Sequence, residues 1–270
     1  MINMKTPAPQ QKEPVGIIKM GKTIAVSGKG GTGKTTVSAL IIRWLSEHRS
    51  KSILAVDADS NVCLHEVLGV NLKETVGSIR EEMKALAAEL PGGMSKQQYL
   101  EYKILSSLTE CPDFDLLAMG RPEGPGCYCY ANNLLRDILD TLSRRYDFVV
   151  IDNQAGMEHL SRRTAGRMDT LLMISDPTVR GIRTAGKISR LVKELDTRIE
   201  NKYLLLNRVT HPLPQIIRAA VDAEGIELLG CIPEDEILLR SDREGQTLWE
   251  RVMNSSAYKA VGQLIEKLLM

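Results

Sequence analysis

The residues with the clearest chemistry lie in a glycine-rich stretch at positions 28–36, GKGGTGKTT. Its spacing satisfies the pattern GxxxxGK[ST], in which glycines let backbone N–H groups close around a polyphosphate. The exposed N–H groups and dipole of a following helix favour the same negative charge. The stretch therefore predicts a nucleotide-binding loop, with Lys34 on the β- and γ-phosphates and the Thr35 hydroxyl on Mg²⁺. The expected nucleotide-binding residues are Gly28, Gly30, Gly31, Thr32, Gly33, Lys34, Thr35 and Thr36.

Acidic residues follow two apolar runs of the chain. Asp57 and Asp59 come at the end of the first run, and Asp152 ends the second. Each run reads as a buried parallel strand, and open α/β sheets bind ligands at the carboxyl ends of such strands. An acid at position 152 can hold Mg²⁺ through water, while Gly156 lets its backbone N–H approach a γ-phosphate. Asp57 and Asp59 could alternatively serve as a helix N-cap or as loop acids.

Cys127 and Cys129 form a second candidate site. Two thiols that are two residues apart in extended backbone point to the same side and can reach one soft ion. The two thiols fill half of the tetrahedral coordination shell of that ion. In a twofold dimer, the pair from each protomer would complete a Cys₄ site. Zinc would be accepted by such thiolates. A redox role or burial in the core is the alternative for this pair.

The remaining thiols and two histidines give weaker signals. Five cysteines in a chain of this size and expected compartment argue against a disulfide framework. Cys63, Cys111 and Cys231 are interpreted as core or adventitious thiols. His65 and His159 could be auxiliary ligands, although a capping or buried role is the simpler interpretation.

Composition limits the classes of function. The chain has 270 residues, 43% hydrophobic and 26% charged, with a net charge of +1. These values predict a globular protein and give no electrostatic case for nucleic acid or anionic membrane as a partner. No apolar run is long enough for a membrane span, and the first residues lack the pattern of a signal peptide. We therefore expect a cytoplasmic protein.

The elements that must position these residues alternate between strand and helix. We expect an α/β fold, a doubly wound and mainly parallel sheet with helices on both faces. Residues 1–20 predict a flexible tail, and 21–270 a single domain with a helical insertion at about 71–110. The C-terminal helix carries one apolar face, which predicts packing rather than membrane binding. The expected strands lie at 23–26, 52–57, 114–119, 147–152, 170–174, 202–206 and 228–232.

The glycine-rich stretch contains a second lysine, Lys29, which the general loop does not require. The string KGGTGKT resembles the deviant Walker A loop of the ParA/MinD and nitrogenase-iron-protein group of dimeric ATPases. The resemblance implies ATP as the nucleotide, a homodimer, and a Lys29 that reaches the partner's phosphates. It also implies that Asp59 orients the attacking water, that Asp57 lies near the metal, and that Asp152 is the Walker B acid. The expected catalytic residues are Lys29, Lys34, Asp57, Asp59 and Asp152.

The same resemblance implies which residues contact the adenine base. Asn207, within Leu206-Asn207-Arg208, and the segment Pro233-Glu234-Asp235 match the family's adenine positions, so Asn207, Arg208, Pro233 and Asp235 are expected there. An Asn amide can pair with the amino group and a ring nitrogen of adenine. Asn207 could instead cap the end of its strand. Relatives often carry Glu where this chain has Gln154, which predicts weaker water activation or switching.

Two further strings narrow the resemblance. MGRPEGPGCYC at 119–129 and AGMEHL at 155–160 are similar to CooC/AcsF-type maturation ATPases. That similarity extends from Lys22 onward and implies nickel insertion into a client enzyme, carbon monoxide dehydrogenase or acetyl-CoA synthase. The alternatives are a MinD/ParA-like positioning or partition ATPase, and an iron–sulfur ATPase similar to the nitrogenase iron protein.

Overall fold

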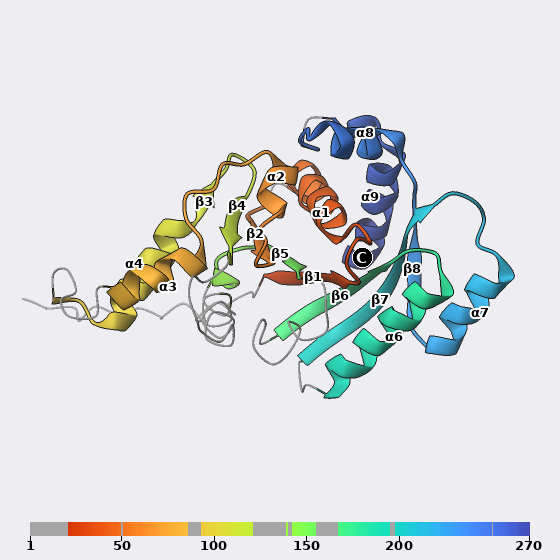
Figure 1. The fold of residues 1–270 in the computed structure, drawn as a ribbon, viewed down its shortest axis with the longest axis horizontal. Coiled ribbons are helices and arrows are strands. Elements are labelled where there is room, and N and C mark those ends of the chain that lie inside the picture. The colour runs from red at the N-terminus through yellow and green to blue at the C-terminus, as the bar shows by residue number, and fades with distance from the viewer. Residues whose placement is uncertain are drawn as a thin grey trace, which may run out of the picture.

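The computed structural model describes residues 21–49, 51–85, 93–120, 139, 142–154, 167–194, 198–249 and 251–270. In this part of the chain an eight-stranded sheet runs in the order β3-β4-β2-β5-β1-β6-β7-β8. All neighbouring pairs are parallel except β3 and β4, which are antiparallel. The expected doubly wound, mainly parallel sheet is therefore confirmed (Figure 1). The strands are β1 (Lys22–Gly28), β2 (Ile53–Ala58), β3 (Thr109–Glu110), β4 (Asp115–Ala118), β5 (Phe148–Asn153), β6 (Arg167–Ser175), β7 (Arg198–Val209) and β8 (Glu227–Pro233).

The centre of the sheet consists of apolar strands that are buried on both faces. β1, β2 and β5 are buried along almost their whole length, as expected for strands covered by helices on each side. This burial explains why they appear in the sequence as continuous apolar runs rather than as an alternation. The carboxylates of Asp57 in β2 and Asp152 in β5 are thus buried at the ends of apolar segments.

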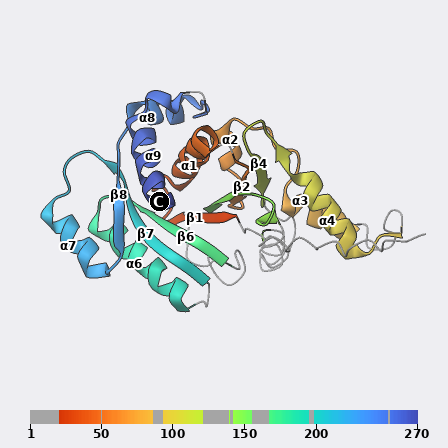
Figure 2. The ribbon, with the colours of Figure 1, turned by 180° about the vertical axis from the view of Figure 1, so that it is seen from behind.

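The helices form a layer on each face of the sheet. The first layer contains α1 (Lys34–Arg49) and α9 (Ser256–Leu269), and the second contains α6 (Val179–Glu194) and α7 (Gln215–Glu224) (Figure 2). Each layer has its own apolar core against the sheet. Shorter helices lie between these elements: α2 (Leu64–Leu68), α8 (Glu236–Glu244) and the 3₁₀ turn Val252–Asn254.

The C-terminal helix packs through the apolar face that the sequence predicts. Val261 and Ile265 are buried, and Leu264, Leu268 and Leu269 pack against the same core. Gly262 lies so close to α1 that an added Cβ would come within 2.6 Å of the Trp44 ring. The helix therefore closes one face of the sheet. Among the described residues, no helix has the length and apolar character needed to cross a membrane.

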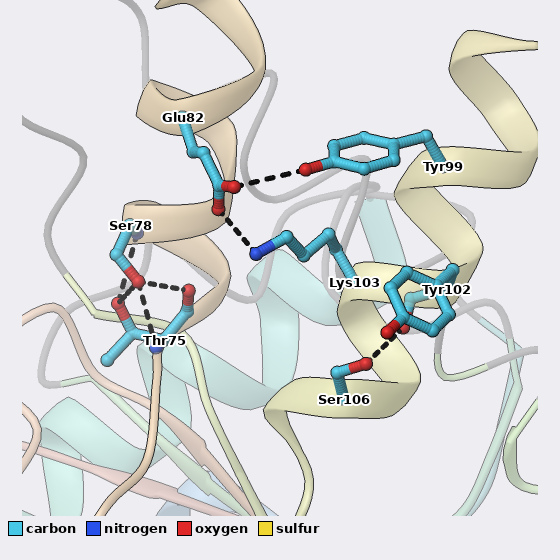
Figure 3. Close-up of polar contacts among 7 residues, drawn as sticks. All are labelled: Thr75, Ser78, Glu82, Tyr99, Tyr102, Lys103 and Ser106. Atoms are coloured by element: carbon cyan, nitrogen blue, oxygen red, sulfur yellow. Dashed lines mark hydrogen bonds and ion pairs between the residues drawn. The ribbon is translucent and has the colours of Figure 1, made fainter. Parts of the chain in front are cut away.

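A pair of helices extends from the β3–β4 edge of the sheet. α3 (Val76–Ala85) and α4 (Lys96–Ser107) lie in the range where the sequence predicts a helical segment. Figure 3 shows how Glu82 of α3 accepts a hydrogen bond from Tyr99 at 3.0 Å and pairs with Lys103 at 2.7 Å, both on α4. Ser95 begins α4 with a capping box, which supplies partners for two backbone N–H groups.

Candidate functional site

The glycine-rich loop connects the end of β1 to the start of α1. Gly28, Gly31 and Gly33 have φ angles of 153°, 79° and 87°, a region that side-chain-bearing residues rarely adopt. A Cβ on Gly28 would lie 2.3 Å from the carbonyl oxygen of Ile174, and one on Gly33 would lie 2.4 Å from Nδ2 of Asn207. The glycines are thus required by backbone conformation and by close neighbours.

Lys34 starts α1 and is buried at the sheet edge. Its Nζ lies 3.4 Å from the backbone oxygen of Lys29, whose carbonyl also accepts a hydrogen bond from the Thr32 hydroxyl at 2.9 Å. Burial lowers the pKa of Lys34, and the nearby charges of Asp152 and Asp59 oppose this change. The lysine, the loop and both acids therefore belong to one site.

Asp57 and Asp152 are side by side on neighbouring strands. They are in register between β2 and β5, and both are buried. Burial raises the pKa of Asp152 to about 7, despite opposing hydrogen bonds from Thr35 and Ser38 and the opposing charge of Lys34. Burial also raises the pKa of Asp57 to about 6, against hydrogen bonds from the backbone of Leu64 and Asp59. A divalent cation would reverse both shifts by favouring the ionised forms.

The donor set fits Mg²⁺. Thr35 supplies a hydroxyl, Asp152 supplies a carboxylate, and hard oxygen ligands of this kind suit the ion. The Thr35 side chain already hydrogen-bonds to Asp152, and the Ser38 hydroxyl donates to Asp152 Oδ1 at 3.2 Å. When bound, the ion would neutralise charge on the phosphates. The sequence analysis did not place Ser38 in this site. Its position one helical turn after Lys34 could have indicated that its hydroxyl lies near the acids.

The expected adenine residues gather on one cavity beside the loop. The cavity is open to solvent. Asn207 donates through Nδ2 to the Thr32 carbonyl at 2.9 Å and accepts from its neighbour's backbone N–H at 3.0 Å. Its amide still has one N–H and one lone pair for a base. The lining includes Gly33, Thr36, Asn207, Arg208, Pro233 and Asp235.

Arg208 and Asp235 also form hydrogen bonds that stabilise the wall of this cavity. Arg208 adopts a φ of 58° and donates through Nη1 to the Gly31 carbonyl at 3.0 Å. Asp235 Oδ1 accepts from the backbone of Ile237 and Leu238 at the start of α8. Its Oδ2 accepts from Ser255, Ser256 and Ala257 at the start of α9. The Asp235 carboxylate therefore joins two helices, a role that the sequence did not suggest.

Lys29 and Asp59, which are both expected near the phosphates of a bound nucleotide, differ in their exposure to solvent. Lys29 is exposed, and its side chain has no hydrogen bond or ion pair within the described residues. Asp59 is half-buried and accepts from the backbone N–H of Asn61 at 2.9 Å. Gly30 and Gly31 are also exposed, so this side of the loop faces outward.

The predicted metal pair lies outside the described part of the chain. Cys127, Cys129, Gly156 and His159 all fall in segments that the structure does not describe. Within the described segments, no group of three or more His, Cys, Asp or Glu side chains is placed to hold a metal ion. Cys63, Cys111 and Cys231 are free thiols, of which Cys63 is exposed and the other two are half-buried.

The fold and the loop together define a P-loop nucleotide-binding protein of the doubly wound α/β class. The sequence profile of the CobQ/CobB/MinD/ParA nucleotide binding domain matches residues 23–248, so the chain belongs to that family. Its site and its family make it an ATP-binding ATPase.

Curated relatives agree with the family assignment, and a solved structure agrees with the fold. An uncharacterised ATP-binding protein of Methanocaldococcus jannaschii is 45% identical, over 91% of this chain and 98% of its own. The carbon monoxide dehydrogenase accessory protein CooC of Rhodospirillum rubrum is 29% identical, over 90% of this chain and 96% of its own. MinD of Pyrococcus horikoshii, solved with Mg-ADP, has a TM-score of 0.67 at 24% identity, over 92% of this chain and 96% of its own.

Proposed function

We propose that this ATPase is a metallochaperone that supports nickel insertion into carbon monoxide dehydrogenase or acetyl-CoA synthase. In this proposal two protomers close around ATP and Mg²⁺, and Cys127 and Cys129 of each protomer complete one thiolate site. Hydrolysis then reopens the dimer and releases the metal to the client enzyme. The Cys-x-Cys pair is the observation that carries the proposal, because ATP hydrolysis alone does not need it.

The route of the chain into this pair supports a link to the nucleotide. β4 ends at Ala118, which is in register with Asp57 on β2. The next residue, Met119, donates its N–H to the Asp57 carbonyl at 2.8 Å, and its own carbonyl accepts from Gly77 at 2.8 Å. The segment that contains the cysteines therefore starts beside the buried acids. Cys127 follows Met119 by eight positions in the sequence, so only a short stretch of chain separates the thiols from this hydrogen bond.

The similarity to the CooC accessory protein of Rhodospirillum rubrum supports the same proposal. The match covers nearly the whole length of that protein, and the name of that protein refers to carbon monoxide dehydrogenase. In this proposal nickel is the cargo rather than a resident cofactor. Zinc would occupy the same thiolates in solution.

Metal analysis combined with mass measurement tests the proposal. The full chain is prepared without nucleotide, with ADP and with a non-hydrolysable ATP analogue, each with Ni²⁺ or Zn²⁺ supplied. We expect about one ion per dimer, bound in the dimeric state, because each protomer supplies half of a four-coordinate shell. Replacing Cys127 and Cys129 by Ser removes the ion and leaves nucleotide binding intact.

A matched variant in which Cys63 and Cys231 become Ser serves as the control and keeps the ion. Metal retained by the Cys127→Ser/Cys129→Ser variant would refute the shared site. A chain that stays monomeric with every nucleotide would refute the coupling. A brown, oxygen-sensitive preparation would favour an iron–sulfur ATPase instead.

A further inference from the structure

The side-chain amide of Gln154 connects two segments of the catalytic site. Gln154 follows Asp152 and Asn153 at the end of β5, and its Nε2 donates to the Ser60 hydroxyl at 3.2 Å. Ser60 is the residue after Asp59. The bond therefore joins the end of β5 to residues 59–63, which we call the Asp59 loop.

The Asp59 loop is fixed at both ends by one buried carboxylate. Asp57 Oδ1 accepts from the backbone N–H of Asp59 at 3.0 Å, and Asp57 Oδ2 accepts from that of Leu64 at 2.8 Å. Between these points Val62 has a φ of 51°, a left-handed conformation that is strained for a β-branched residue. Ser60 lies in this stretch, where the hydrogen bond to Gln154 links it to the sheet.

The other half of the Gln154 amide is buried without a partner. Its Oε1 accepts no hydrogen bond within the described part of the structure, although the atom is shielded from solvent. A buried acceptor of this kind carries a free-energy cost and needs an explanation. The cost would be removed when ATP and its ordered water fill the site and supply a donor.

We propose that Gln154 is a positioning residue for ATP hydrolysis, which acts through Ser60 on the loop that carries Asp59. The charge of Asp59 acts on Lys34, so the loop lies within electrostatic reach of the expected phosphate contact. An amide does not titrate in the range where enzymes work, so Gln154 orients groups and takes no proton. The inference concerns the ATPase step alone and is independent of the metal site.

Steady-state ATPase assays of four variants test this inference: Gln154→Ala, Ser60→Ala, the double variant and Gln154→Glu. We expect each single alanine variant to lower kcat about tenfold with the KM for ATP little changed, because the bond orders the loop rather than holding ATP. The double variant falls no further than either single one, since both changes remove the same bond. Gln154→Glu stays within about threefold of the wild type, because the Ser60 hydroxyl can donate to a carboxylate.

Two matched controls are Gln263→Ala, on the exposed side of α9, and Ser189→Ala, on α6. Both should leave kcat unchanged, and thermal unfolding checks that every variant is folded. If Gln154→Ala does not fold, Ser60→Ala carries the test, because it removes a single hydroxyl. The proposal would be overturned if the losses of the two single variants multiplied in the double variant, or if the single alanine variants kept the kcat of the wild type. It would also be overturned if their KM for ATP rose in parallel, or if Gln154→Glu were as slow as Gln154→Ala.

Discussion

The ammonium group of Lys34 is buried at the start of α1, within electrostatic reach of two acids. The side chain is 8% exposed, and Asp152 and Asp59 supply the charges that oppose its desolvation. A buried lysine without phosphates is costly, and the phosphates of ATP supply the missing counter-charge. This residue is thus suited to bind the nucleotide and to stabilise charge in the transition state.

Replacing Lys34 by Ala should lower ATP turnover by at least about a hundredfold, because one preorganised charge on the phosphates is lost. Phosphate release at saturating ATP measures the effect. Circular dichroism should show a folded monomer, since the change removes a buried charge rather than a core side chain. Lys259→Ala, on the exposed side of α9, is the control. Turnover retained by the Lys34→Ala variant would contradict the P-loop assignment.

At the scale of the elements, Asp235 joins the start of α8 to the start of α9. Burial alone would raise the pKa of this carboxyl, but hydrogen bonds from Ser256, Ala257, Ser255 and Ile237 outweigh burial and lower the pKa to about 2. Four donors on Oδ2 come from the N-terminal turn of α9 and its cap. The wall of the cavity beside the glycine-rich loop therefore depends on this one acid.

Asp235→Asn should lower the free energy of unfolding at pH 7 by about 2 kcal/mol, because an amide cannot accept all of these bonds. The folded pKa lies below the unfolded value of 3.8, so the stabilisation is complete above about pH 4. It is lost as the pH falls toward 2. Urea unfolding of both proteins across this range should show their difference shrinking toward acid.

The matched control is Asp222→Asn, an exposed acid on α7 that should change stability little. A difference between wild type and Asp235→Asn that stays constant down to pH 2 would show that the carboxylate charge is not responsible. A stability equal to that of the wild type at pH 7 would contradict the joining role of Asp235 altogether.

At the scale of the whole molecule, the proposed dimer would place a second copy over the exposed edge of the glycine-rich loop. Lys29, Gly30 and Gly31 face outward, whereas Lys34 is turned inward. Two lysines of one loop thus have opposite environments. This arrangement agrees with a lysine reserved for the nucleotide of a partner protomer.

Lys29→Ala should weaken the ATP-analogue-dependent dimer by at least about thirtyfold, because it leaves a phosphate charge of the partner unpaired. Light scattering after gel filtration measures the mass in each nucleotide state. Nucleotide binding to the monomer should remain close to that of the wild type. An undiminished dimer in the Lys29→Ala variant would show that this lysine does not act between protomers.

Much of the fold could be predicted from local patterns. Long apolar runs between charged stretches predict buried parallel strands, and the glycine-rich loop between strand and helix fixes the ligand edge. Boundaries were less certain, since β7 spans Arg198–Val209 where the sequence predicts a strand at 202–206 only. The helix α2 and the short antiparallel β3 were missed, because each is too brief for a periodic signal.

The sequence by itself determined the nucleotide loop, the order of strand and helix, and the residue types that could bind Mg²⁺ or a soft metal. Only the tertiary structure decided which side chains meet: Gln154 with Ser60, Ser38 with Asp152, and Asp235 with two helix starts. Local backbone preferences act over a few residues, so they can be predicted from the sequence. Contacts between separate elements, such as Ser38 with Asp152 at a separation of 114 positions, depend on the register of the sheet and on packing, which a single sequence does not show.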